Sequence, residues 1–179
     1  FRTDFVSKNQ RIRHSTMKKL LFIALACIAF GCKVSYSFRG GEIPGQTFSI
    51  ESFTNTATLV NPNLAIVMQD ELQERFTNES NLKYTDGFGE AHFKGVITKY
   101  AITPVQGTGT ETVALNRLTI SVKITYSNSK NDSQDFDKIF SSFDDFESTQ
   151  DFSSIEDELM KTISEKLVAL IYNETLMEW

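Results

Sequence analysis

Apolar and polar residues alternate along several stretches of the chain, and a period of two is typical of strands. The clearest alternation runs from Ala114 to Tyr126, where apolar residues occupy the even positions from Leu118 onward. Less regular alternation predicts further strands over 46–53, 82–85, 90–105 and 136–146. A change of phase near Gly95 predicts a bulge there. A sheet of these strands should bury one face and leave the other polar.

Two other stretches carry apolar residues every three or four positions, which predicts amphipathic helices. Asn61 and Pro62 are expected to cap and begin the first, which runs to about Thr77. Ser153 and Glu156 have the spacing of a capping box for the second. Its expected buried stripe is Ile155, Leu159, Ile163, Leu167, Leu170 and Ile171. The predicted fold class is therefore α+β, a two-layer sandwich with both helices on one face of a mostly antiparallel sheet of about four strands.

An apolar run near the start of the chain is uninterrupted by charged residues and shows neither the strand period nor the helix period. From Met17 the chain continues with two lysines, then eleven uncharged residues from Leu20 to Phe30, then Gly31 and Cys32. Eleven helical residues span about 16 Å, which is about half of the hydrocarbon core of a bilayer. A charged start, a short apolar run and a small residue at the end are typical of a secretory signal peptide.

The end of this run resembles the processing site of lipoproteins, in which a small residue precedes a cysteine. Gly31 and Cys32 match that pattern, while Ala29 and Phe30 fit it loosely. The resemblance implies cleavage between Gly31 and Cys32, with a diacylglycerol on the Cys32 sulfur and an acyl group on its new amino terminus. Several acyl chains hold a protein stably on a membrane. An ordinary secretory signal with a chance cysteine is the alternative.

These features predict four parts of the chain. Residues 1–16 precede a complete signal and are expected not to belong to the native protein, 17–31 form the signal peptide, 32–45 a lipidated tether, and 46–179 a single α+β domain. Retention and surface-export signals of lipoproteins usually involve acidic residues just after the cysteine, and Lys33-Val34-Ser35 contains none. The expected location is the outer membrane, lipid-anchored on its periplasmic side.

Charge and chemistry narrow the possible functions. Residues after 31 include 12 basic and 22 acidic side chains, which disfavours nucleic acid as a partner. With both cysteines in or beside the signal and His92 as the single histidine after it, thiol and histidine-based mechanisms have no support. The acid-rich segment 132–158 lacks the calcium-loop pattern, and the glycine-rich loop Gln106–Thr110 lacks the lysine of a phosphate loop. We expect no catalysis, no metal and no cofactor beyond the acyl groups on Cys32.

Six segments, in their order along the chain, resemble the lipopolysaccharide-assembly lipoprotein family, LptE, in its form divergent from the enteric one. They are Tyr36-Ser37-Phe38, Val60-Asn61-Pro62, the ITKYAITP strand from Ile97 to Pro104, Ala114–Ile120, Ser154–Leu159 and the final Trp179. The resemblance implies two helices on a four-stranded sheet. It also implies a non-enzymatic lipoprotein that plugs, and helps to assemble, an LptD-like β-barrel that exports lipopolysaccharide to the outer leaflet.

Because the apolar faces of such a domain are committed to its core, polar faces and loops should contact the barrel. The candidates are Arg117, Thr119, Ser121 and Lys123 with the loop 106–110, although an ordinary solvated sheet face gives the same alternation. Some family members bind lipopolysaccharide through basic residues, and direct binding of lipopolysaccharide by this acidic chain is left open. The alternative function is a periplasm-facing carrier of a lipid or apolar small molecule, which needs an open cavity. A hydrolase with an acidic pair is the least favoured hypothesis.

Overall fold

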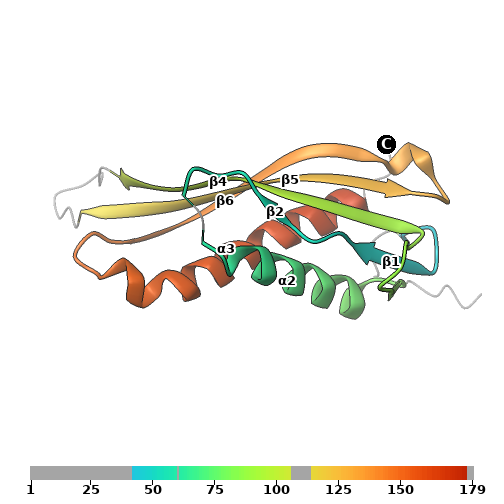
Figure 1. Ribbon diagram of the computed structural model, residues 1–179, viewed down its shortest axis with the longest axis horizontal. Helices are drawn as coiled ribbons and strands as arrows, with labels where there is room; N and C mark the ends of the chain where they lie inside the picture. The colour runs from blue at the N-terminus through green and yellow to red at the C-terminus, as the bar shows by residue number, and fades with distance from the viewer. Residues whose placement is uncertain (1–41, 60, 106–113, 177–179) are drawn as a thin grey trace, which may run out of the picture. The chain divides into compact units, whose positions relative to one another are not determined.

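The computed structural model describes residues 42–59, 61–105 and 114–176, and Figure 1 shows two helices on one side of an open sheet. The predicted α+β two-layer fold is confirmed. In chain order the elements are β1 (Thr47–Ile50), β2 (Thr54–Asn55), α2 (Leu64–Glu79), β3 (Lys83–Tyr84), β4 (Ala91–Val105), β5 (Leu115–Asn128), the short 3-10 helix η1 (Asp132–Gln134), β6 (Phe136–Glu147) and α3 (Phe152–Thr175).

The sheet is mixed and has more strands than expected. Its order is β3-β1-β4-β5-β6, and β2 pairs with β4 beside β1. The long strands β4, β5 and β6 form an antiparallel meander. The short strands β1 and β2 lie parallel to β4, and β3 lies parallel to β1. The mostly antiparallel sheet is therefore extended at one margin by short parallel strands.

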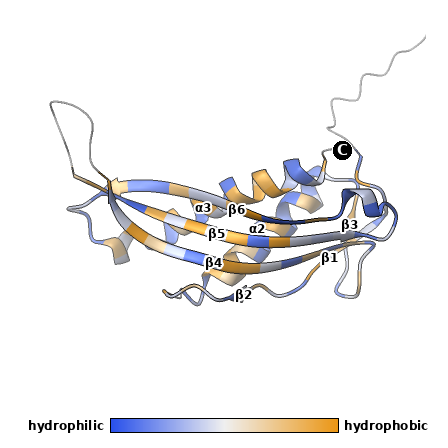
Figure 2. Cartoon of the chain, turned by 90° about the horizontal axis from the view of Figure 1, so that it is seen from above, coloured by the Kyte–Doolittle hydropathy of each residue, from blue (hydrophilic) through white to orange (hydrophobic). Residues whose placement is uncertain are grey.

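One face of the meander is buried beneath the helices and the other is open. Figure 2 looks onto the open face, with α2 and α3 behind the sheet. In β5 the side chains at even positions from Leu118 to Tyr126 are buried, whereas Arg117, Thr119 and Lys123 are partly exposed. Successive side chains of a strand point to opposite faces, so the predicted division of this strand into a core side and a polar side is confirmed.

The two helices fill the buried side with apolar side chains at helical spacing. The buried residues of α2 are Leu64, Met68, Leu72 and Phe76, and those of α3 include Leu159, Ile163, Leu167 and Ile171. Near the end of α2, the Tyr172 hydroxyl donates to the Glu79 carbonyl at 2.7 Å, and its ring meets Phe76 edge to face. Leu170, predicted in the buried stripe of α3, is 46% exposed, and that prediction is wrong. No helix in the described ranges is both long and apolar enough to cross a membrane.

Both helices begin differently from the prediction. The N-cap of α2 is Asn63, and Asn61 accepts a hydrogen bond from its backbone N–H at 2.9 Å, so Pro62 precedes the helix. The N-cap of α3 is Asp151, whose carboxylate accepts from the Ser153 N–H. The predicted capping box is therefore wrong, because Asp151 already caps this end and the Glu156 carboxylate binds other partners.

The irregularity in β4 also lies further along than predicted. The register with β5 shifts between Ile97 and Lys99, so the bulge predicted at Gly95 is misplaced. Gly95 instead makes room for the buried ring of Phe53, because a Cβ on Gly95 would lie 2.2 Å from that ring. The glycine thereby lets the segment after β1 pack against the sheet.

We predict that Ile124→Ala and Leu167→Ala each lower the free energy of unfolding by about 2 to 5 kcal/mol, as large-to-small changes in a core do. Both side chains are fully buried, one on the sheet and one on α3. Thr125→Ala, next to Ile124 but on the open face, should change stability by less than about 0.5 kcal/mol. Urea unfolding of the full chain measures all three, and equal losses at residues 124 and 125 would contradict the assigned faces.

Candidate functional site

The four residues predicted to contact a partner lie on the open face of the sheet. Arg117, Thr119, Ser121 and Lys123 project from alternate positions of β5, which lies between β4 and β6. The structure therefore brings all four onto one side of the sheet, although Ser121 is only 7% exposed. The loop 106–110 and the predicted processing residues Gly31 and Cys32 lie outside the described residues.

Arg117 is held in place by two side chains of β6. Its Nε and Nη2 donate to the two carboxylate oxygens of Asp145 at 2.7 and 2.8 Å, and the guanidinium lies 3.6 Å from the centre of the Phe143 ring. The hydrogen bonds lower the pKa of Asp145 and raise the pKa of Arg117. A bidentate pair of this kind fixes the guanidinium plane as well as its charge.

The other candidates also have partners on β6. The Lys123 ammonium lies 3.0 Å from Oδ2 of Asp137. The Ser121 and Ser141 hydroxyl oxygens are 2.9 Å apart, and Thr119 lies opposite Phe143 in the register. The two cations of the predicted contact surface are therefore neutralised by adjacent carboxylates, and the face is a set of cross-strand pairs.

Two lysines of β4 extend this face and were missed by the sequence reasoning, which considered β5 alone. Lys94 lies opposite Thr125 and 3.4 Å from Oε1 of Glu51. Lys99 lies opposite Ser121 and is exposed, and it forms no ion pair with any described residue. Alternation in 90–105 could have indicated both positions, but the phase shift after Ile97 obscured their common face.

A hydrogen-bond network on the helix side joins three segments that carry the family resemblance. The Tyr100 hydroxyl of β4 donates to Oε1 of Glu156 in α3 at 2.5 Å, and the Asn61 amide donates to the same oxygen at 2.7 Å. Burial raises the pKa of Tyr100, and its hydrogen bond to Glu156 raises it further. The network ties the start of α3 to the sheet and to the segment before α2, which is a positioning role.

His92, the single histidine of the domain, lies between a serine and a glutamate, as a catalytic histidine can, but the serine is not accessible to a substrate. Its Nδ1 is 2.8 Å from the Ser49 hydroxyl oxygen, and its Nε2 is 3.8 Å from Glu51. Ser49 is only 4% exposed, and its oxygen already accepts from the Gly89 N–H. This geometry favours a structural role for His92. No group of His, Cys, Asp and Glu suited to a metal ion occurs within the described residues.

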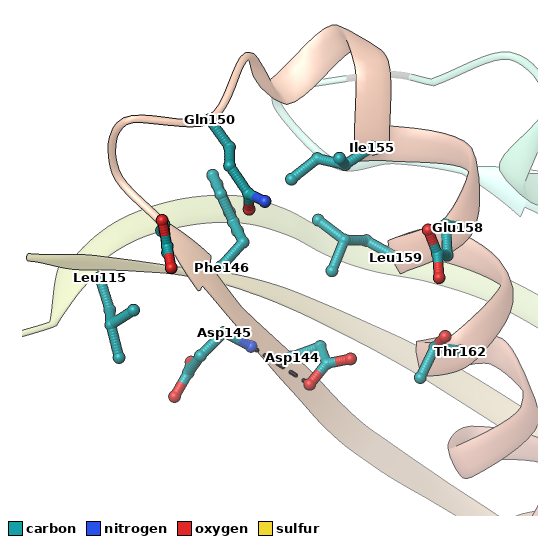
Figure 3. A pocket seen from close by; sticks show the side chains of 10 residues that line it. Leu115, Asp144, Asp145, Phe146, Gln150, Ile155, Glu158, Leu159 and Thr162 are labelled. Atoms are coloured by element: carbon teal, nitrogen blue, oxygen red, sulfur yellow. Dashed lines mark hydrogen bonds between the residues drawn. The ribbon is translucent and has the colours of Figure 1, made fainter. Parts of the chain in front are cut away.

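A surface pocket of about 380 Å³ lies between the end of β6 and the start of α3 (Figure 3). Its apolar lining comes from Leu115, Phe146, Ile155 and Leu159, and its carboxylates from Asp144, Asp145, Glu147 and Glu158. The pocket thus combines a small apolar surface with several negative charges at the end of the two layers.

Comparison with known protein families finds a match over most of the domain. A family model described as LptE, lipopolysaccharide-assembly, matches residues 45–175. No curated protein matches the sequence.

Several solved structures are similar to this chain at low sequence identity. A protein from Xanthomonas campestris is 8% identical with a TM-score of 0.52, covering 75% of this chain and 86% of its own. A hypothetical protein from Chlamydia trachomatis is 12% identical with a TM-score of 0.51, covering 74% and 96%. A minor lipoprotein from Acinetobacter baumannii is 11% identical with a TM-score of 0.48, covering 73% and 92%. The Xanthomonas and Chlamydia structures, with TM-scores above 0.5, support the fold of this chain and say nothing about its function.

We predict that the Arg117–Asp145 pair makes stability depend on acid pH. Because Arg117 lowers the pKa of Asp145 in the folded state, the contribution of this carboxylate is present above the unfolded Asp pKa of about 3.9 and is lost as pH falls through the lower folded value. Asp145→Asn should therefore reduce the free energy of unfolding at pH 7 and make its decline in acid shallower. Urea unfolding of the full chain across this pH range measures the slope.

Asp86→Asn is the matched control, because Asp86 is exposed in a turn and forms no ion pair with the described residues. That variant should keep the acid slope of the unchanged protein. An Asp145→Asn protein with the same slope as the control would show that the pair does not contribute.

Proposed function

The chain belongs to the LptE family of lipopolysaccharide-assembly proteins, and on this premise we propose that it plugs, and helps to assemble, an LptD-like β-barrel of the outer membrane. Membership of this non-catalytic family implies a role in lipopolysaccharide assembly. The finer proposal is that this domain enters the barrel lumen and that the assembled pair passes lipopolysaccharide to the outer leaflet.

The open sheet face is the observation that carries this proposal. The interior of outer-membrane barrels is polar, so a domain inside one must present polar surface to the wall. The open face does so through hydroxyls and ion pairs on the long strands β4, β5 and β6, although it also exposes the apolar side chains of Ile139 and Phe143 on β6. Its ion pairs with Asp137 and Asp145 suit contact with a polar protein surface better than binding of phosphate groups.

A lipid carrier, the alternative function, has less support in the same geometry. A carrier needs apolar space between the helices and the sheet, where Leu64, Leu72, Ile163 and Leu167 are fully buried by other side chains. The pocket beside β6 is lined by four carboxylates, of which Asp144 and Asp145 form ion pairs with Lys166 and Arg117. The charges of Glu147 and Glu158 would repel an anionic headgroup.

We also propose that Cys32 carries the acyl groups that anchor the protein to the periplasmic side of the outer membrane, with Gly31 preceding the cut. The net negative charge of the chain disfavours attachment to anionic lipid by charge. Multiple acyl chains supply stable attachment without it. Residues 32–45 would then link the acyl groups to the domain, the last of them packed against it through the buried Ile43.

Cys32→Ser is predicted to abolish acylation and to leave the protein unprocessed or free of the membrane, because the hydroxyl cannot form the thioether. Cys27→Ser, within the apolar run, is the matched control and should be acylated normally. Metabolic labelling with a fatty acid, followed by membrane fractionation, measures both. Normal labelling and membrane retention of the Cys32→Ser protein would refute this anchor.

The barrel contact is tested by reversing charge on the open face. Arg117→Glu combined with Lys123→Glu should reduce the recovery of an LptD-like barrel when the full lipidated chain is purified from outer membranes. Lys83→Glu combined with Lys161→Glu changes net charge equally at exposed positions on β3 and α3, and should leave recovery unchanged. Undiminished recovery with the first variant would exclude this face as the contact.

Stability must be measured alongside, because Arg117 contacts both Asp145 and Phe143 and its reversal is not expected to be neutral for folding. The exchange variant Arg117→Asp with Asp145→Arg keeps an ion pair while moving its charges. Thermal melting of each variant separates loss of contact from loss of fold. Reduced recovery in a variant that melts like the unchanged protein supports the contact.

A further inference from the structure

The outer edge of β6 is long and lacks two of the usual protections of a sheet edge. β6 pairs with β5 alone and has twelve residues, none of them proline, so its free edge runs for about 40 Å. At the other margin, β1, β2 and β3 have only two to four residues each, and the end of β4 contains Pro104. Short strands and proline are devices that prevent edge pairing, and β6 has neither. It does carry five charged side chains, which are a third such device, and four of these five (Asp137, Lys138, Asp144 and Asp145) form ion pairs within the chain.

The free backbone groups of this edge belong to the odd-numbered residues. Leu115 of β5 lies opposite Glu147 of β6, and just beyond this pair the Ser148 N–H donates to the Ala114 carbonyl. In an antiparallel pair every second residue directs both its N–H and its carbonyl at the partner strand. The backbone groups of the even-numbered residues of β6 therefore face β5. The Phe143 carbonyl accepts instead from Lys166 of α3, at 3.3 Å. By the same alternation, the N–H and carbonyl groups of Asp137, Ile139 and Ser141 point away from the sheet.

Large apolar side chains are exposed above and below this edge. Ile139 is 65% exposed and Phe143 is 46% exposed, and both lie on the open face. On the other side, α3 runs antiparallel to β6, because Lys166 pairs with Asp144 and Glu174 pairs with Lys138. Leu170, midway between those two helix residues and about half exposed, therefore lies beneath the middle of β6.

We propose that this edge binds the β6 strand of a second copy of the chain, antiparallel and centred on Ser141. In that register Ile139 of each copy lies opposite Phe143 of the other, on the open face. On the helix face Lys138 lies opposite Asp144 of the other copy, and the two Leu170 side chains meet beneath the central pair. Each favourable pair occurs twice, as the two-fold symmetry of an isologous contact requires.

The same register also sets carboxylates opposite one another. At each end of the paired region Glu147 lies opposite Asp135 of the second copy, where both side chains are exposed to water. Asp137 lies opposite Asp145 of the second copy, but Lys123 and Arg117 already neutralise these carboxylates within each chain. Lys166 must release the Phe143 carbonyl, which then accepts from the Ile139 N–H of the second copy. The Lys166 ammonium keeps its ion pair with Asp144. The self-complementary order of apolar and charged residues identifies a second copy as the occupant. This inference goes beyond the proposed function and does not depend on it.

Cross-linking tests the register directly. Paired Ser141 residues would have Cα atoms about 5.5 Å apart, within the range of about 4.4 to 6.8 Å that a disulfide spans. Ser141→Cys in the full chain, with Cys27→Ser, should form a disulfide-linked dimer under mild oxidation. The same background without the added cysteine gives the baseline.

Glu147→Cys is the matched control, because Glu147 is exposed at the end of the same strand. In the proposed register the two copies of this residue lie roughly 40 Å apart, so this variant should stay at the baseline. Equal cross-linking at residues 141 and 147, or baseline cross-linking at residue 141, would overturn the proposal.

Sedimentation of the full chain in detergent tests the apolar contact independently. Ile139→Lys places a charge on the edge and should weaken the dimer by about tenfold or more, as loss of a central apolar anchor does. Ile66→Lys makes the same change at a 61% exposed position on α2 and should dimerise like the unchanged protein. A monomeric unchanged protein, or equal dimerisation of the two variants, would overturn the proposal.

Discussion

The rest of the structure depends on one interaction: helices α2 and α3 pack on one face of the meander formed by β4, β5 and β6. Successive side chains of a strand point to opposite faces, so burying Ile120 and Ile124 beneath the helices obliges Arg117 and Lys123 to face away. Each fully buried aliphatic side chain contributes about 1.5 to 3 kcal/mol. The same alternation therefore creates both the core and the open face, and the candidate contact surface cannot change register without destroying the core.

The main elements could be predicted because their signals are local and repeated. The alternation over 114–126 and the helical stripes identified the sheet faces and both helices. The strands predicted over 46–53 and 82–85 contain β1 and β3, whereas β2 has only two residues, too few to show a period. Motifs that several partners can satisfy were misassigned. Glu156 has the spacing of a capping box, yet its carboxylate binds Tyr100 and Asn61, and Gly95 accommodates a ring rather than a bulge. Only tertiary contacts decide between such partners.

The partners of the candidate contact residues likewise could not be predicted from the sequence. Sequence periodicity placed Arg117 and Lys123 on one face, but it could not reveal that Asp145 and Asp137 lie opposite or beside them, because that depends on the register between β5 and β6. The difference matters for function. A face with free cations would suit phosphate groups, while a face of neutralised pairs is suited to another polar protein surface.

β6 connects the open face with the free edge of the sheet. Its Asp137 and Asp145 neutralise the cations of β5, and its backbone supplies the unpaired edge. Phe143 belongs to both surfaces, since its ring lies beneath the Arg117 guanidinium and its carbonyl lies on the edge. A barrel wall that covers Arg117 would therefore meet the same side chain that the second copy would bury. On these proposals the two contacts compete at Phe143, so a copy seated in a barrel would not pair with another copy through its edge.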